Sequence, residues 1–173
     1  MVEKMQRSEI STHVNKKYLN SRVFCIEIAN FLMEEIIKEK ISADHLLYVS
    51  LKYTKTCDVI LNLLYRWKVM IEKGMEKLIE KAKKSKKWKP VPNAPRAKLV
   101  QLKKIYAKVP EVRDTLELYE FFRDVDKLEK TREHEFRKGV NLKVKYRGEI
   151  INVNIEKLEE YAEILERFIS YLK

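Results

Sequence analysis

The chain has 173 residues, of which 45% are hydrophobic and 36% are charged, and its formal net charge is +11. This length suits one domain, and the hydrophobic share is enough for a packed core, which excludes a globally disordered protein. The charged share exceeds the roughly 25% of an average domain, and the abundance of Lys and Glu over Gln is typical of thermophilic proteins. Neither a membrane span of about 18 to 20 apolar residues nor an apolar signal sequence is present, so we expect a cytoplasmic protein.

The first part of the chain predicts one helix after a loose start. Residues 1–14 are polar and mixed in charge, so we expect an irregular lead-in to a single domain that spans 1–173. Apolar residues recur at helical spacing over about 16–39, which predicts the first helix. The segment from Ile41 to Asp44 is then expected to be a short connection, with Ser42 as the N-cap of the next helix.

A second, very long helix is predicted over about 43–84. Its apolar residues alternate at spacings of four and three, as in a coiled-coil seam. This seam comprises Tyr53, Cys57, Ile60, Leu64, Trp67 and Ile71, and Met75, Leu78 and Ala82 continue it. Because glycine costs about 1 kcal/mol in a helix interior, a kink or break at Gly74 remains open. Apolar residues off the seam indicate a helix in the centre of a bundle.

Prolines shape the next part of the chain. Pro90, Pro92 and Pro95 predict an extended basic loop over 85–95, because each disfavours a helix at the residue before it. A short third helix is predicted over 96–107. After Pro110, apolar residues at spacings of three and four predict a fourth helix over about 111–134.

The last part combines a hairpin with a helix. Apolar and polar residues alternate from Val140 to Arg147 and resume after Gly148, which predicts a β-hairpin over about 140–153 with an Arg-Gly turn. Asn154 is the expected N-cap of a C-terminal helix. The predicted fold is therefore mainly α: an antiparallel bundle of about five helices with one small β-hairpin before the last helix.

Residues 81–110 hold the whole excess of positive charge. They carry eleven Lys and Arg residues, all four prolines and Trp88, but no Asp or Glu, whereas the other 143 residues carry 26 charges of each sign. Dense positive charge displaces counterions from phosphates, and the face of a tryptophan stacks on unpaired bases. We therefore expect a non-enzymatic accessory protein that binds RNA or DNA without sequence specificity. The residues assigned to this role are Lys83, Lys84, Lys86, Lys87, Trp88, Lys89, Arg96, Lys103 and Lys104.

Two other interpretations of the basic segment remain open. It is either a solvated loop, in which Trp88 folds back onto the bundle, or a docking site for an acidic partner. With a solvated loop, the protein would be an interaction module that forms a homodimer or docks a partner through the helical seam or the edge of the hairpin.

The remaining hypothesis is a metal-dependent nuclease. On the predicted fourth helix, Asp126, Glu129 and Glu133 fall on one face, which could hold Mg²⁺, and His134 beside them could act as a general base. Surface ion pairs with Lys130 and Arg137 explain the same pattern equally simply. No nucleotide-binding or catalytic motif is present, so we assign no catalytic residue, metal site or cofactor.

The two cysteines, Cys25 and Cys57, lie within apolar helical patterns and do not form a CxxC motif. Since a zinc site needs clustered Cys or His ligands, we expect two buried, reduced thiols instead.

Overall fold

The structure is a computed structural model that describes residues 27–173. The expected lead-in over 1–14, the start of the first helix and Cys25 lie outside the described residues. A helix runs from residue 27 to residue 45 and continues through a π-helical segment, η1 (Leu46–Ser50), into α2 (Leu51–Thr54). The elements that follow are α3 (Cys57–Lys84), α4 (Pro95–Ile105), α5 (Pro110–Asp124), the 3-10 turn η2 (Val125–Lys127), β1 (Lys130–Glu133), β2 (Asn141–Tyr146), β3 (Glu149–Val153) and α6 (Ile155–Leu172).

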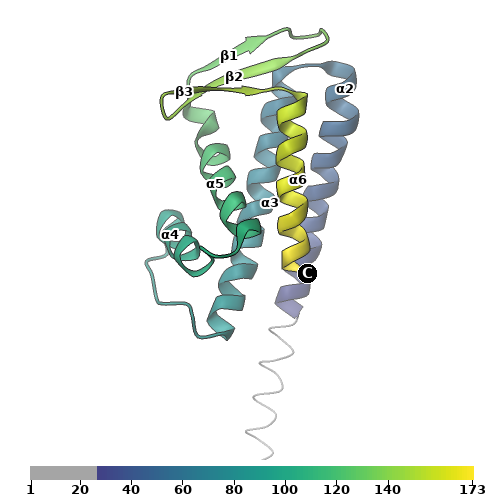
Figure 1. Cartoon of the computed structure of the whole chain (residues 1–173). Helices are drawn as coiled ribbons and strands as arrows, with labels where there is room; N and C mark the ends of the chain where they lie inside the picture. The colour runs from purple at the N-terminus through teal and green to yellow at the C-terminus, as the bar shows by residue number, and fades with distance from the viewer. Residues whose placement is uncertain (1–26) are drawn as a thin grey trace, which may run out of the picture.

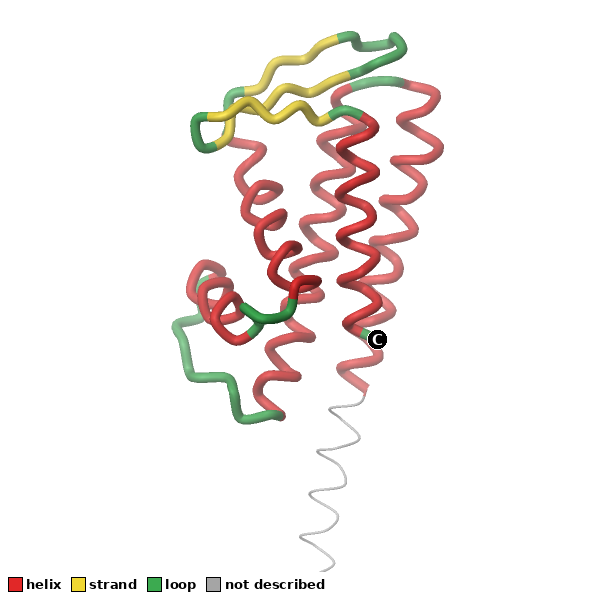
Figure 2. The backbone as a smooth tube through the Cα atoms, viewed as in Figure 1, coloured by secondary structure: helices red, strands yellow, loops and turns green. Residues whose placement is uncertain are grey.

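The predicted fold class is confirmed, since the protein is a helical bundle with a small antiparallel sheet before its last helix. Figure 1 shows the long helices side by side, with the sheet across one end of the bundle and the connection between α3 and α4 at the other end. The tube in Figure 2 follows this connection as a long loop that leads to α4, which lies beside α5. Within residues 27–173, no helix has both the length and the apolar character needed to span a membrane.

Helix α3 is the centre of the core, as its apolar pattern predicted. The seam residues from Cys57 to Ala82 are all buried, and Leu63 and Met70 beside the seam are buried as well. The helix is continuous through Gly74, where a Cβ atom would lie 2.6 Å from the Phe168 ring of α6. Gly74 therefore lets α3 and α6 approach closely and does not break the helix.

The prediction of a connection at 41–44 is wrong, because the helix continues through these residues. Ser42 is not an N-cap: its hydroxyl donates to the Lys38 carbonyl within the helix, at 3.1 Å. Buried Ala43 and Leu47 extend the apolar face beyond the expected end. The chain turns instead at Lys55, which has a left-handed backbone (φ 51°), so the predicted helix over 43–84 is divided there. Tyr53 lies before this turn and is 76% exposed, outside the buried seam.

The predicted fourth helix is correct at its start and wrong at its end. Helix α5 ends at Asp124, and the residues from Lys130 to Glu133 form β1, which pairs with β2 in an antiparallel register. The Lys130 amine donates to the carbonyls of Val125 and Asp126, each at 2.8 Å, and so satisfies backbone groups at the end of the helix. The sequence analysis missed β1, which is an edge strand of charged and polar residues.

The hairpin and the last helix are confirmed. Arg147 and Gly148 both have positive φ, 52° and 88°, as a tight two-residue hairpin turn requires. Leu142, Val144 and Val153 are buried where the sheet covers the end of the bundle. The Asn154 side chain accepts a hydrogen bond from the Lys157 amide at 2.9 Å, which makes it the N-cap of α6.

Candidate nucleic-acid interface

The basic loop begins with a helix-ending turn that places an unusual residue in a strained position. The Lys87 amide donates to the Ala82 carbonyl (2.9 Å), and the Lys86 amide donates to the Lys83 carbonyl (3.0 Å). This pair of bonds is a Schellman motif, in which the residue after the C-cap adopts a left-handed conformation and is usually glycine. Here that residue is Lys86, with φ 56°. A charged side chain therefore occupies a position where it costs roughly 1 to 2 kcal/mol of backbone energy.

Four lysines at the end of α3 and in the loop after it, called the loop lysines below, face solvent. Lys84, Lys86, Lys87 and Lys89 are exposed, and none of them takes part in the ion pairs found among residues 27–173. Lys83, also predicted for the site, pairs with Glu80 at 2.8 Å. Unpaired ammonium groups along one short segment give a high local density of positive charge at the end of the bundle that lies away from the sheet (Figure 1).

Trp88 joins the loop to the bundle. Its side chain is half-buried and packs against the hydrophobic core, while part of it remains open to solvent. Its amide donates to the Ala82 carbonyl at 3.2 Å, so the backbone at this point is held by the end of α3. Trp88 thus positions the lysines on both sides of it, and its open part is available for a ligand.

The three predicted residues on α4 do not share one environment. Lys103 forms an ion pair with Glu120 of α5 at 3.0 Å, and Glu120 also pairs with Arg147 at 2.9 Å. Arg96 is exposed, and together with a hydrogen-bonded Arg123 it holds the pKa of Asp124 below its usual value. Lys104 is exposed as well. The α4 cations are thus partly offset by α5 carboxylates, unlike those of the loop.

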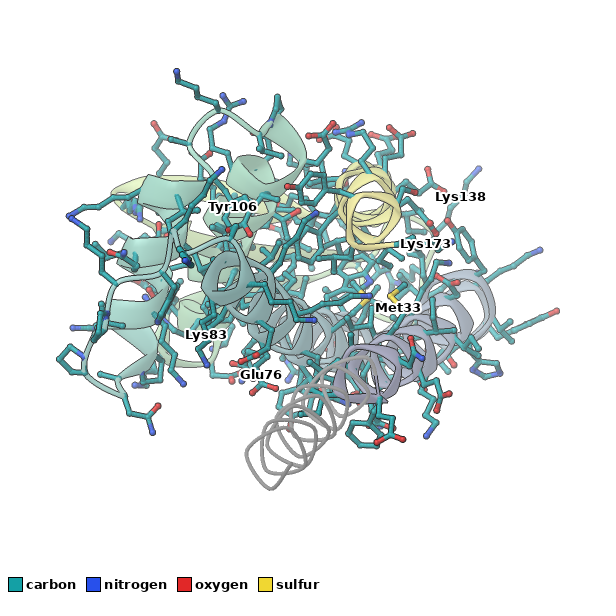
Figure 3. All side chains as sticks on the ribbon, turned by 90° about the horizontal axis from the view of Figure 1, so that it is seen from below. Met33, Glu76, Lys83, Tyr106, Lys138 and Lys173 are labelled. Atoms are coloured by element: carbon teal, nitrogen blue, oxygen red, sulfur yellow. The ribbon has the colours of Figure 1, made fainter. Side chains whose placement is uncertain are left out.

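A groove lies beside the loop, and sequence reasoning did not find it. The groove has a volume of about 590 Å³, and its lining comes from the first helix, α3, the loop and the start of α4. It includes Phe31, Leu32, Ile79, Lys83, Trp88 and Lys98. Figure 3 views the bundle from this end and shows Lys83 and Glu76, another lining residue, on the same side of α3. Phe31 lines this groove although its side chain is 61% exposed.

The residues of the nuclease hypothesis do not assemble. Asp126 lies in η2, Glu133 lies in β1, and His134 follows the strand with φ 54°, so they share no helical face. Glu129 pairs with Lys145 at 3.5 Å and Glu133 pairs with Lys143 at 2.8 Å, rather than with the expected Lys130 and Arg137. Within residues 27–173, no three His, Cys, Asp or Glu side chains lie close enough together to hold a metal ion.

Cys57 has a structural place at the start of α3. It is fully buried, and burial raises the pKa of its thiol, which favours the unreactive protonated form. Its amide donates to the Glu135 carboxylate at 3.0 Å, and Glu135 is also 3.5 Å from Arg132, whose guanidinium pairs with Asp58 at 2.7 Å. The segment from Arg132 to Glu135 therefore joins the sheet to the helices.

No protein-family model matches this chain, and no curated protein or solved structure matches it either.

Proposed function

We propose that this protein binds RNA or DNA through the loop between α3 and α4, without reading its sequence. The observation that carries the proposal is the group of four exposed lysines, Lys84, Lys86, Lys87 and Lys89, which have no acidic partner within residues 27–173. A phosphate backbone is the natural partner for such a group, because its charges are closely spaced and it releases counterions on binding. The loop contains no helix or strand that could enter a groove of a duplex to read base edges.

The conformation of Lys86 supports the same proposal. Glycine would relieve the strain at this left-handed position, yet the residue there carries a charge. Strained backbone is frequent at binding sites, and here the hydrogen bonds of the Schellman motif hold it in place. A lysine at this point projects from the turn where the chain leaves α3, between the other loop cations.

The experiment is a titration of fluorescent single- and double-stranded RNA and DNA at several salt concentrations. Four phosphate contacts give a slope of about −3 to −4 for log affinity against log salt. In the variant Lys84→Gln, Lys86→Gln, Lys87→Gln and Lys89→Gln, we expect the slope to approach zero and the affinity to fall on every sequence alike.

A matched variant separates a local site from total charge. Lys52, Lys127, Arg137 and Lys138 are exposed on the other side of the molecule, and changing all four to Gln removes the same formal charge. We expect this variant to keep most of the affinity and the salt slope. Equal losses in both variants would contradict the proposal, because the binding would then follow net charge alone.

The rival hypothesis of an interaction module has less support. The α3 seam is buried by the chain's own helices, so it is not free to form a dimer. The edge strand β1 is four residues long and carries Lys130, Arg132 and Glu133, and short charged edges disfavour pairing with another sheet. Light scattering measures the molar mass with and without nucleic acid. A stable dimer whose mass does not change when nucleic acid is added would favour the interaction module.

A further inference from the structure

The groove has apolar and aromatic surface and lies beside the basic loop. Its floor includes Leu32 and Ile79, which are nearly buried, and two aromatic side chains, Trp88 and Phe31, lie along it. Phe31 is 61% exposed, although it sits on a helix whose next residue is buried. Two aromatic rings that line one groove and stay partly open to water are surface that a ligand can cover.

The lining of the groove is itself balanced, with Lys83 and Lys98 against Glu76 and Glu80, and the excess positive charge comes from the lysines of the adjoining loop. Of the two carboxylates that line the groove, Glu80 is already paired with Lys83 at 2.8 Å. In a nucleic acid strand, a base can stack on an aromatic ring while the neighbouring phosphates form ion pairs with lysines.

We propose that this groove takes an unpaired base, which makes the protein selective for single-stranded nucleic acid. The inference rests on the proposed function, because the loop lysines hold the phosphates on either side of the inserted base. In a duplex, each base is already stacked and paired, so it cannot enter the groove without first leaving the helix. Duplexes therefore keep only the phosphate contacts, whereas single strands gain the aromatic contact as well.

Trp88 itself provides the signal for the test. The only other tryptophan, Trp67, is buried and stacks on Phe122 at 5.9 Å between ring centroids, so a Trp67→Phe variant leaves Trp88 as the single fluorophore. This variant is titrated with a single-stranded 12-nucleotide DNA and with its duplex. We expect the single strand to quench Trp88 and to bind about tenfold more tightly than the duplex.

Two substitutions then test the groove itself, with a matched control. Phe31→Ala and Trp88→Ala should each lower single-strand affinity about tenfold and leave duplex binding and the salt slope unchanged. Phe31→Ala is the decisive variant, because Trp88 also packs against the core and its removal affects stability. Phe136, 77% exposed near the sheet, is the control, and Phe136→Ala should change neither affinity.

The outcomes separate this inference from the function on which it rests. Equal affinity for single strand and duplex, without quenching of Trp88, would overturn the groove proposal and leave phosphate binding by the loop intact. An acidic peptide that quenches Trp88 and binds as tightly as the single strand would also overturn it, in favour of a protein partner. Binding to no nucleic acid at low salt would remove both proposals.

Discussion

At the sheet end of the bundle, charged side chains from different elements pair with one another, whereas at the loop end four neighbouring lysines have no such partners among residues 27–173. Arg132 reaches Asp58 on α3, and Arg147 reaches Glu120 on α5, so these pairs connect the sheet to the helices. Residues with left-handed backbone occur at both ends, but their hydrogen bonds reach different distances. Near the sheet, Phe136 and Lys55 both have positive φ, and the Phe136 amide donates to the Lys55 carbonyl at 2.8 Å between distant parts of the chain. At the loop end, the Lys86 amide donates to the Lys83 carbonyl, three residues earlier.

What is local in this protein is the excess of positive charge, because residues 81–110 carry eleven Lys and Arg and no Asp or Glu. Ion pairs at the sheet end offset charge within the chain, and they fix how the sheet sits on the bundle. The loop lysines fix nothing within residues 27–173, so their charge remains available to an external anion. Substitutions at the sheet end should therefore act mainly on stability, and substitutions of the loop lysines mainly on binding.

The largest expected effect is on stability, from Leu142→Ala in β2. Leu142 is fully buried between the sheet and the helices, so its truncation should lower the free energy of unfolding by about 2 to 5 kcal/mol. Urea denaturation measures this change. Lys145→Ala, on the exposed side of the same strand, is the control and should stay within about 0.5 kcal/mol. A loss below about 1 kcal/mol for Leu142→Ala would mean that the sheet is not part of the core.

A smaller effect is expected from Glu135→Ala, which removes the acceptor for the Cys57 amide at the start of α3. Glu135 acts as an N-cap supplied from a distant loop, since Thr56 at the N-cap position makes no side-chain cap. The loss should be about 0.5 to 2 kcal/mol, with faster hydrogen exchange in the first turn of α3. Glu129→Ala, which removes an exposed carboxylate, is the comparison. If the two substitutions cost the same, the cap does not stabilise the helix.

The smallest effect separates stability from binding at Lys86. Lys86→Gly should raise the free energy of unfolding by up to about 1 kcal/mol, because glycine tolerates the left-handed conformation. It should also weaken nucleic-acid binding and reduce the salt slope by about one phosphate contact. Lys87→Gly removes the same charge at a residue without positive φ, so it should weaken binding similarly but lower stability. We expect the melting temperature to rise for Lys86→Gly and to fall for Lys87→Gly. Changes in the same direction would contradict the strain argument.

Local sequence patterns predicted the C-terminal part of the fold well. The hairpin combines period-two alternation with a glycine in its turn, and α6 combines an Asn cap with a regular apolar stripe. Each signal lies within a few residues of the element that it specifies. The burial of α3 was predictable for the same reason, because its apolar residues fall on more than one side of the helix.

The errors occurred where a distant contact decides the local conformation. Lys55 adopts a left-handed backbone without being glycine, and its carbonyl accepts from the distant Phe136 amide, so this turn has no sequence signal of its own. β1 has no apolar alternation, because it is an edge strand whose side chains are exposed or half-buried, and its pairing with β2 defines it. Of the candidate site, the lysines were predictable from composition, but the groove depends on how the loop docks beside Phe31 and Ile79.

During synthesis from the N-terminus, the central helix α3 is made well before α6, the helix that covers part of its surface. The surface of α3 around Gly74 is covered by Phe168 and Leu172, which belong to α6 and are synthesised long after α3. Until residues 155–172 have emerged, a strip of apolar side chains along α3 lacks its partner, and such strips attract chaperones or other nascent chains. Translation that stalls before α6 would therefore yield an aggregation-prone fragment, even though about nine-tenths of the chain had been made.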